Sequence, residues 1–181
     1  LDMDVIEERD RLIDEDPSKY ALFIRGLEKV YPPGLFCGQT KYAVRNISFA
    51  CPYGERFGLL GINGAGKTTT LGILTGDCSA TAGEVFVGGY PLSDPRTKTL
   101  IGYCPQVDPL LEAMNSFETL FFFGRVRGIP ETVLNLRINK LIDQVGLRKH
   151  AKRPCGTYSG GNKRKLSLAV AMIGEPKVLF L

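Results

Sequence analysis

Hydrophobic and polar positions along the chain follow two different patterns that meet near Tyr20. Residues 1–18 are polar and highly charged, which is typical of a linker or of a frayed helix. After Tyr20, short apolar runs alternate with loops and with helix-like segments, and each apolar run predicts a strand. The predicted strands are 21–24, 44–49, 56–60, 84–87, 101–104 and 178–181.

Four later segments have the pattern of helices. Gly76 is the predicted C-terminal stop of the first, and Asn115 with Glu118 forms a capping-box pattern at the start of the second. Pro130 is a favourable first residue for the third. The predicted helices run from 68 to 74, from 115 or 116 to about 127, from behind 130 to 145 or 146, and onward from 161. Strands that alternate with helices in this way predict an α/β fold with a parallel core sheet.

Composition places the chain among globular proteins. It has 181 residues, of which 44% are hydrophobic and 23% charged, and its mean hydropathy is −0.02. These values indicate one domain with a hydrophobic core, and they exclude a disordered tail and a membrane span. The first residues lack an initiating Met and the basic and apolar regions of a signal peptide, so we expect a piece of a longer protein.

Charge is unevenly distributed along the chain. Residues 1–20 carry eight acidic and three basic side chains, a net charge of −5, whereas the other 161 residues carry +9. A basic body of this kind favours anionic ligands. The five cysteines include no Cys-x-x-Cys pair, and His150 is the one histidine of the sequence. We therefore expect reduced cysteines, a cytosolic location and no zinc site.

The most informative stretch is Gly-Ile-Asn-Gly-Ala-Gly-Lys-Thr at 61–68, a complete phosphate-loop motif. Its glycines allow successive backbone N–H groups to point at phosphate oxygens, and the following helix directs its positive dipole end there. Lys67 would bind the β- and γ-phosphates, and the Thr68 hydroxyl would coordinate Mg²⁺. A chance match occurs in roughly one chain of this length in a hundred. The predicted nucleotide-binding residues of this loop are Gly61, Asn63, Gly64, Ala65, Gly66, Lys67, Thr68 and Thr69.

A phosphate loop alone does not identify the class of nucleotide-binding protein. A guanine-specific GTPase needs an Asn-Lys-x-Asp motif, and the similar stretch at 162–165 has Lys165 where the Asp is required. The sequence Tyr-Ser-Gly-Gly-Asn at 158–162 instead resembles the signature of ATP-binding cassette (ABC) proteins, usually Leu-Ser-Gly-Gly-Gln. A serine hydroxyl and glycine amides at a helix N-terminus form a second anion site.

Further motifs extend the resemblance over almost the whole chain. Gly-Tyr-Cys-Pro-Gln at 102–106 resembles the Q-loop of these proteins. Tyr31 fits the aromatic residue that stacks on adenine, a contact worth about 1–3 kcal/mol, and Tyr42 is a weaker candidate. The stretches that together resemble the A subfamily of ABC transporters, large eukaryotic membrane proteins that export or flip lipids, are 4–11, 55–69, 74–77, 102–108 and 158–167.

The resemblance implies a P-loop NTPase fold with a mainly parallel core sheet, an N-terminal antiparallel β subdomain and an inserted helical subdomain at about 110–165. It also implies an acidic linker at 1–19 and an ATP-binding domain at 20–181. Lys67 and Gln106 would be catalytic, and Gln106 would reach Mg²⁺ and the attacking water. The signature residues, which would bind the ATP of a partner domain, are Ser159, Gly160, Gly161 and Asn162.

The same resemblance implies a parent membrane transporter that carries this domain on its cytosolic face. ATP and Mg²⁺ would be the cofactors, and the partners would be a second nucleotide-binding domain, the transmembrane domain of the same chain and a lipid-like substrate. In the family, the strand at 178–181 continues into the Walker B aspartate and the catalytic glutamate, and a switch histidine follows. The chain ends before them, so we expect these 181 residues alone to bind ATP weakly and to hydrolyse it negligibly.

Two other functions remain open on the sequence. Basic runs at 148–153 and 163–165 are compatible with a soluble ABC ATPase that acts on nucleic acid or ribosomes. Such runs are usually solvated faces, and we do not expect a nucleic-acid partner. The third option is a non-catalytic cassette that binds ATP as a structural partner. Apolar stretches of about 20 residues ahead of the domain would identify a transporter.

Overall fold

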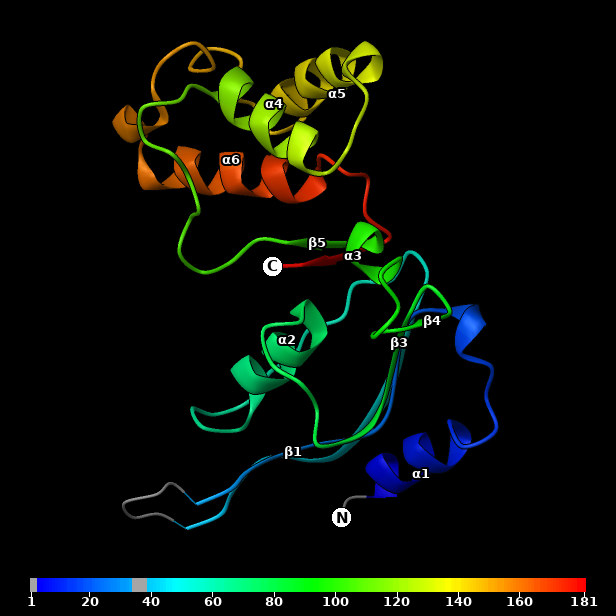
Figure 1. The fold of residues 1–181 in the computed structure, drawn as a ribbon. Coiled ribbons are helices and arrows are strands. Elements are labelled where there is room, and N and C mark those ends of the chain that lie inside the picture. Colours follow the sequence, from blue (N-terminus) through cyan, green and yellow to red (C-terminus); the bar gives the residue numbers. More distant parts are fainter. Residues whose placement is uncertain (1–2, 34–38) are drawn as a thin grey trace. The chain divides into compact units, whose positions relative to one another are not determined.

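The computed structural model describes residues 3–33 and 39–181. Residues 1 and 2 of the predicted linker and one cysteine, Cys37, lie outside the described residues. The chain forms two compact units, Leu1–Lys98 and Thr99–Leu181, and each is described by itself (Figure 1). Within the described part of the chain, no helix is both long and apolar enough to cross a membrane.

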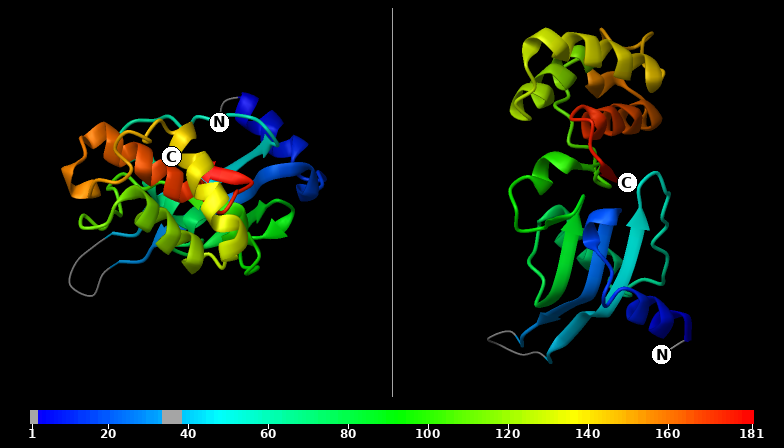
Figure 2. Two further views of the ribbon diagram at one scale, coloured as in Figure 1. Left: turned by 90° about the horizontal axis from the view of Figure 1, so that it is seen from above. Right: turned by 90° about the vertical axis from the view of Figure 1, so that its right-hand side faces the viewer.

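The N-terminal unit is built on an antiparallel sheet of four strands in the order β2-β1-β3-β4, and Figure 2 shows β2, β1 and β3 side by side. Phe23 of the central strand β1 is fully buried and lies opposite Ala50 of β2 and Phe86 of β3. All four side chains of 21–24 are buried, and since successive side chains of a strand point to opposite faces, both faces of this part of β1 are covered. The elements of this unit are α1 (Met3–Arg11), a 3-10 helix (Pro17–Lys19), β1 (Tyr20–Tyr31), β2 (Lys41–Pro52), α2 (Lys67–Thr75), β3 (Ala82–Val87) and β4 (Tyr90–Pro91).

The sequence predicts either a linker or a frayed helix for the acidic segment ahead of the sheet. In the structure this segment contains a helix, α1. Leu12, directly after α1, is fully buried. The guanidinium of Arg25 on β1 donates to the backbone carbonyl of Ile13 at 2.7 Å and pairs with the Glu84 carboxylate on β3 at 2.6 Å. One buried leucine and one arginine therefore attach the acidic segment to the sheet.

The C-terminal unit combines a parallel pair of strands with a group of helices. β5 pairs with β6 in parallel, with Ile101 opposite Val178. The predicted α/β class is confirmed, with an antiparallel sheet in the first unit and a parallel pair in the second. After α3 (Thr97–Leu100), which follows the N-terminal sheet, the elements are β5 (Ile101–Tyr103), α4 (Ser116–Val126), α5 (Glu131–Gln144), a 3-10 helix (Cys155–Thr157), α6 (Gly160–Met172) and β6 (Val178–Phe180).

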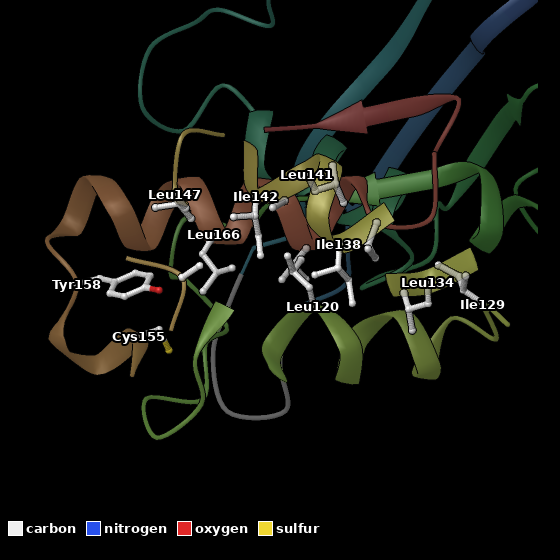
Figure 3. Close-up of a cluster of buried hydrophobic side chains, with 14 residues drawn as sticks. Leu120, Ile129, Leu134, Ile138, Leu141, Ile142, Leu147, Cys155, Tyr158 and Leu166 are labelled. Carbon is white, nitrogen blue, oxygen red and sulfur yellow. The ribbon is translucent and has the colours of Figure 1, made fainter. Parts of the chain in front are cut away.

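Helices α4, α5 and α6 share one cluster of buried apolar side chains (Figure 3). Leu120 of α4, Leu134 of α5 and Leu166 of α6 are all fully buried in it. Gly124 of α4 lies directly against Leu134, where a Cβ atom would collide with the leucine side chain. This close approach explains why an apolar helix face carries a glycine in its last turn.

Helix ends that depend on local signals lie where the sequence predicts them. The Asn115 side chain accepts the Glu118 N–H at 3.1 Å, and the Glu118 carboxylate accepts the Asn115 N–H at 2.8 Å, which confirms the capping box. Gly76 ends α2 in the left-handed conformation, with φ of 86°. Pro130 differs by one position, because it precedes the first helical residue of α5 instead of occupying it.

The strand predicted at 56–60 is not formed, and this prediction is wrong. Phe57 is 51% exposed, Leu60 is 91% exposed, and no strand of the described residues pairs with this run. Apolarity alone does not make a strand, because a strand is stable only where neighbouring backbones satisfy its N–H and C=O groups. Phe57 instead stacks on Phe49 of β2, with ring centroids 4.7 Å apart.

We predict that truncation in the shared cluster destabilises the chain far more than truncation on the helix surface. Leu120→Ala should lower the free energy of unfolding by about 2–5 kcal/mol, because it removes buried methyl groups and leaves a cavity. Val126→Ala, at a site on the same helix that is 69% exposed, should change it by less than about 0.5 kcal/mol. Urea denaturation followed by circular dichroism measures both, and equal losses would contradict the assignment of the core.

Candidate nucleotide-binding site

The phosphate loop lies in the N-terminal unit and leads directly into α2. The Ala65 N–H donates to the Ile62 carbonyl at 3.2 Å, which closes a tight turn, and Gly64 and Gly66 have φ of 86° and 90°. Glycine adopts this left-handed conformation without steric cost. No side chain caps α2, so the N–H groups of its first turn are available to an external acceptor. This geometry fits a phosphate group.

Gly66 is required by its surroundings as well as by its backbone angle. A Cβ atom at this position would collide with the backbone carbonyl oxygen of Ala43 on β2. The neighbouring Val44 is 2% exposed, so the strand cannot move aside without disturbing the core. The third glycine of the motif therefore allows the loop to lie directly against the sheet.

The ammonium group of Lys67 lies across the phosphate loop. Its Nζ donates to the carbonyl of Gly61 at 2.7 Å and to the carbonyl of Ile62 at 2.8 Å. A lysine ammonium has three donors, so these contacts hold the charge over the loop and leave one donor for a further acceptor. The positive charge and the N-terminus of α2 act on the same small region, which favours an anion there.

Thr68 is the one hydroxyl in the loop motif that could contribute to a metal site. Its residue is exposed at the start of α2, whereas Thr70, two residues later, is buried. Among the residues that the structure describes, no group of three or more His, Cys, Asp or Glu side chains could hold a metal ion. The Thr68 hydroxyl is an oxygen donor of the kind that Mg²⁺ prefers.

The signature stretch lies in the C-terminal unit, at the N-terminus of α6. Ser159 is the N-cap, and its hydroxyl accepts the Asn162 N–H at 3.4 Å. A Cβ atom at Gly160 or Gly161 would have no atom within 4 Å, so these glycines present open backbone at the helix start. The start of α6 therefore has accessible backbone, and the second anion site stays a prediction.

The tyrosine that replaces the usual leucine of the signature has a structural role. Tyr158 is 8% exposed, and its hydroxyl lies 2.8 Å from the Ser116 hydroxyl and donates to the His150 carbonyl at 2.8 Å. A buried phenol is stable when its hydroxyl is hydrogen-bonded. The ring fills the cluster seen in Figure 3, while its oxygen binds two segments far apart in sequence.

Gln106 is exposed in the loop that follows β5. Cys104, two residues earlier, is buried and donates its backbone N–H to the Phe180 carbonyl of β6 at 2.9 Å, and burial raises the pKa of its thiol. Arg164 of α6 donates to the carbonyls of Cys104 and Pro105. The structure thus brings the predicted Q-loop and the signature helix together through Arg164, for which the sequence predicts no such contact.

The basic runs are engaged in contacts within the C-terminal unit. Lys163 pairs with Glu112 at 3.0 Å, and Arg148 pairs with Asp143 at 2.5 Å and donates to the Asn139 side chain at 2.9 Å. Lys149, Lys152, Arg153 and Lys165 of the same runs are exposed, so these ion pairs neutralise only part of the charge.

Tyr31 is the last residue of β1, and it is 39% exposed. The ammonium of Lys29 lies 4.9 Å from the centroid of its ring. A partly exposed ring in this position can present one face to a flat ligand. Tyr42 of β2, the weaker candidate, is 56% exposed and lies 5.6 Å from the guanidinium carbon of Arg45.

A family model described as ABC transporter matches residues 44–181, more than half of the chain. This chain belongs to the ABC transporter family. The match includes the phosphate loop, the Gln106 loop and the signature stretch.

Relatives within the ABC family narrow the assignment. The chain is 45% identical to the phospholipid-transporting ATPase ABCA3 of Mus musculus and 42% identical to the phospholipid-transporting ATPase ABCA7 of Homo sapiens, in each case over 99% of its length. It is 41% identical to the ABC transporter A family member 6 of Dictyostelium discoideum. The chain spans 11%, 8% and 11% of these three proteins. It is an ABC transporter ATP-binding domain of the A subfamily.

Solved structures support the fold. The chain is similar to an ATP-binding subunit of an ABC transporter, with a TM-score of 0.74, 24% identity and coverage of 88% of this chain and 64% of that one. It is also similar to cbiO1 of Clostridium perfringens, with a TM-score of 0.76, 24% identity and coverage of 89% and 64%. The antiparallel sheet, parallel strands and helices thus belong to the ABC ATPase fold.

We predict that the two left-handed glycines of the loop differ in their tolerance of a methyl group. The Cβ atom added by Gly64→Ala has no neighbour within 4 Å. This variant should lower the free energy of unfolding by about 1–2 kcal/mol through its positive φ alone. Gly66→Ala adds the collision with the Ala43 carbonyl and should cost at least about 1 kcal/mol more. Urea titration compares the two variants, and a Gly66→Ala variant as stable as Gly64→Ala would refute the close contact with β2.

Proposed function

We propose that this domain couples ATP binding and hydrolysis to the movement of a lipid-like substrate across a membrane, as part of a larger transporter. The observation that carries the proposal is the phosphate loop, in which Lys67 and the free amides of α2 converge. The similarity over 99% of the chain to proteins named as phospholipid-transporting ATPases supports the transport of a lipid.

Each part of the site has a separate role in this proposal. The loop residues Gly61, Asn63, Gly64, Ala65 and Gly66, with Thr69, present backbone N–H groups to the phosphates of ATP. Lys67 neutralises charge at the β- and γ-phosphates, and Thr68 and Gln106 would hold Mg²⁺, which would supply further positive charge at the γ-phosphate. Tyr31 stacks on the adenine ring. Ser159, Gly160, Gly161 and Asn162 bind the ATP held by a partner domain.

The partners follow from this arrangement. A signature that binds another domain's ATP requires a second nucleotide-binding domain, placed head to tail with this one. We propose that a transmembrane domain of the same chain forms the transport path and that the ATP-binding domain lies on the cytosolic face of the membrane. The boundaries at 1–19 and 20–181 and the helical subdomain at about 110–165 stay predictions, as does negligible hydrolysis by the 181 residues alone.

Two alternatives predict different behaviour. A soluble ATPase that acts on nucleic acid needs a free basic surface, and the ion pairs of Lys163 and Arg148 reduce the available charge. A non-catalytic cassette binds ATP without turnover. Measurement of ATP hydrolysis by the full-length protein distinguishes this option from the transporter.

We predict that Lys67→Ala weakens ATP binding at least roughly tenfold, because it removes the charge that the loop holds over the phosphates. Lys98→Ala is the matched control, since it removes an exposed lysine of the same unit. Equilibrium titration with a fluorescent ATP analogue measures both affinities in the presence of Mg²⁺. Unchanged affinity of Lys67→Ala would count against the assignment of the loop.

We predict that the full-length protein, reconstituted in vesicles, moves a fluorescent phospholipid between leaflets only with ATP and Mg²⁺. Removal of Mg²⁺ with a chelator should abolish both hydrolysis and lipid movement. The Lys67→Ala variant should lose both, and Lys98→Ala should retain both. Hydrolysis without lipid movement would contradict the lipid substrate and would leave the ATPase assignment intact.

A further inference from the structure

One arginine joins the two parts of the C-terminal unit that the proposed function assigns to different nucleotides. Arg164 lies in the second turn of α6, which begins with the signature residues. Its Nη1 donates to the Pro105 carbonyl, and its Nη2 donates to the Cys104 carbonyl at 3.4 Å. These two carbonyls lie directly ahead of Gln106 in the chain. The same side chain therefore contacts the start of the Gln106 loop.

The other side of the Gln106 loop also contacts this guanidinium. Oδ1 of Asp108 lies 3.6 Å from Nη1 of Arg164. This oxygen is buried and has no hydrogen-bond partner among the described residues, so Arg164 provides its charge compensation. Arg164 thus contacts the backbone just before Gln106 and the carboxylate of Asp108 just after it. Gln106 lies between these two contacts.

Guanidinium chemistry explains why an arginine serves this role. Its planar group carries five N–H donors in a fixed arrangement, which allows two carbonyls and a carboxylate to be contacted at once. A lysine ammonium is a point charge on a flexible stem and cannot hold three acceptors in one plane. The contact therefore defines the orientation of the loop as well as its distance from α6.

We propose that Arg164 is a positioning residue that couples the signature helix to Gln106, an inference that rests on the proposed function. Ser159 lies five residues before Arg164, so the two are about 7.5 Å apart along a rigid helix. A displacement of the helix start, caused by contact between Ser159 and a nucleotide on a partner domain, moves Arg164 and the Gln106 loop with it. Gln106 is then correctly placed only when the signature is engaged.

The test compares Arg164→Met with Lys165→Met in the full-length protein. Methionine keeps an unbranched apolar stem and removes the guanidinium donors, and Lys165 is an exposed cation next to Arg164 on α6. Arg164→Met should lower kcat for ATP hydrolysis roughly tenfold or more and raise the Mg²⁺ concentration needed for half-maximal activity. KM for ATP should change less than about twofold, because the phosphate loop is untouched. Lys165→Met should match the unmodified protein in all three values.

Two further variants separate positioning from general stability. Arg164→Lys should restore less than half of the lost kcat, since one ammonium cannot replace the planar fork. Asp108→Asn should lower kcat by itself but add little to Arg164→Met, because both act through one contact. A proportional fall of kcat and bound ATP, with no change in Mg²⁺ dependence, would indicate a structural role and overturn the inference. Unmodified protein without ATPase activity would overturn the proposed function instead.

Discussion

The nucleotide site depends on a contact between two backbones, Gly66 of the phosphate loop and Ala43 of β2. Because no Cβ atom separates them, the loop is supported by a strand whose next residue, Val44, belongs to the core. The position of Lys67 and the start of α2 follow from this support. The position of the loop is therefore set by the sheet beneath it, and Tyr31 at the end of β1 is the sheet residue proposed to touch the nucleotide.

In the C-terminal unit, too, buried residues position the exposed residues of the predicted site. The apolar cluster around Leu120 and Leu166 fixes α6 against its neighbours, and this places Ser159 and Arg164 on a rigid helix. Tyr158 shows how one residue serves both purposes, since its ring packs in the cluster while its place in the chain defines the signature.

Features determined by neighbouring residues could be predicted from the sequence. The capping box at Asn115, the helix stop at Gly76 and the phosphate loop all depend on residues within a few positions of one another. The strand at 56–60 could not be predicted correctly, because strand formation depends on partners elsewhere in the chain. The contact of Arg164 with Pro105 spans 59 positions, and the sequence shows Arg164 only within a basic run that is typical of a solvated face. A charged run gives no indication of which carbonyl or carboxylate each cation will find after folding.

The attachment of the acidic segment has a mechanical consequence. Arg25 joins the Ile13 carbonyl to the Glu84 carboxylate across two strands, and Leu12 anchors the same point in the interior. A pulling force applied at α1 would therefore act on the central strand β1, near buried Phe23, and would not be taken up by a flexible linker. These contacts connect α1 to β1, the strand that pairs with β2 beneath the phosphate loop.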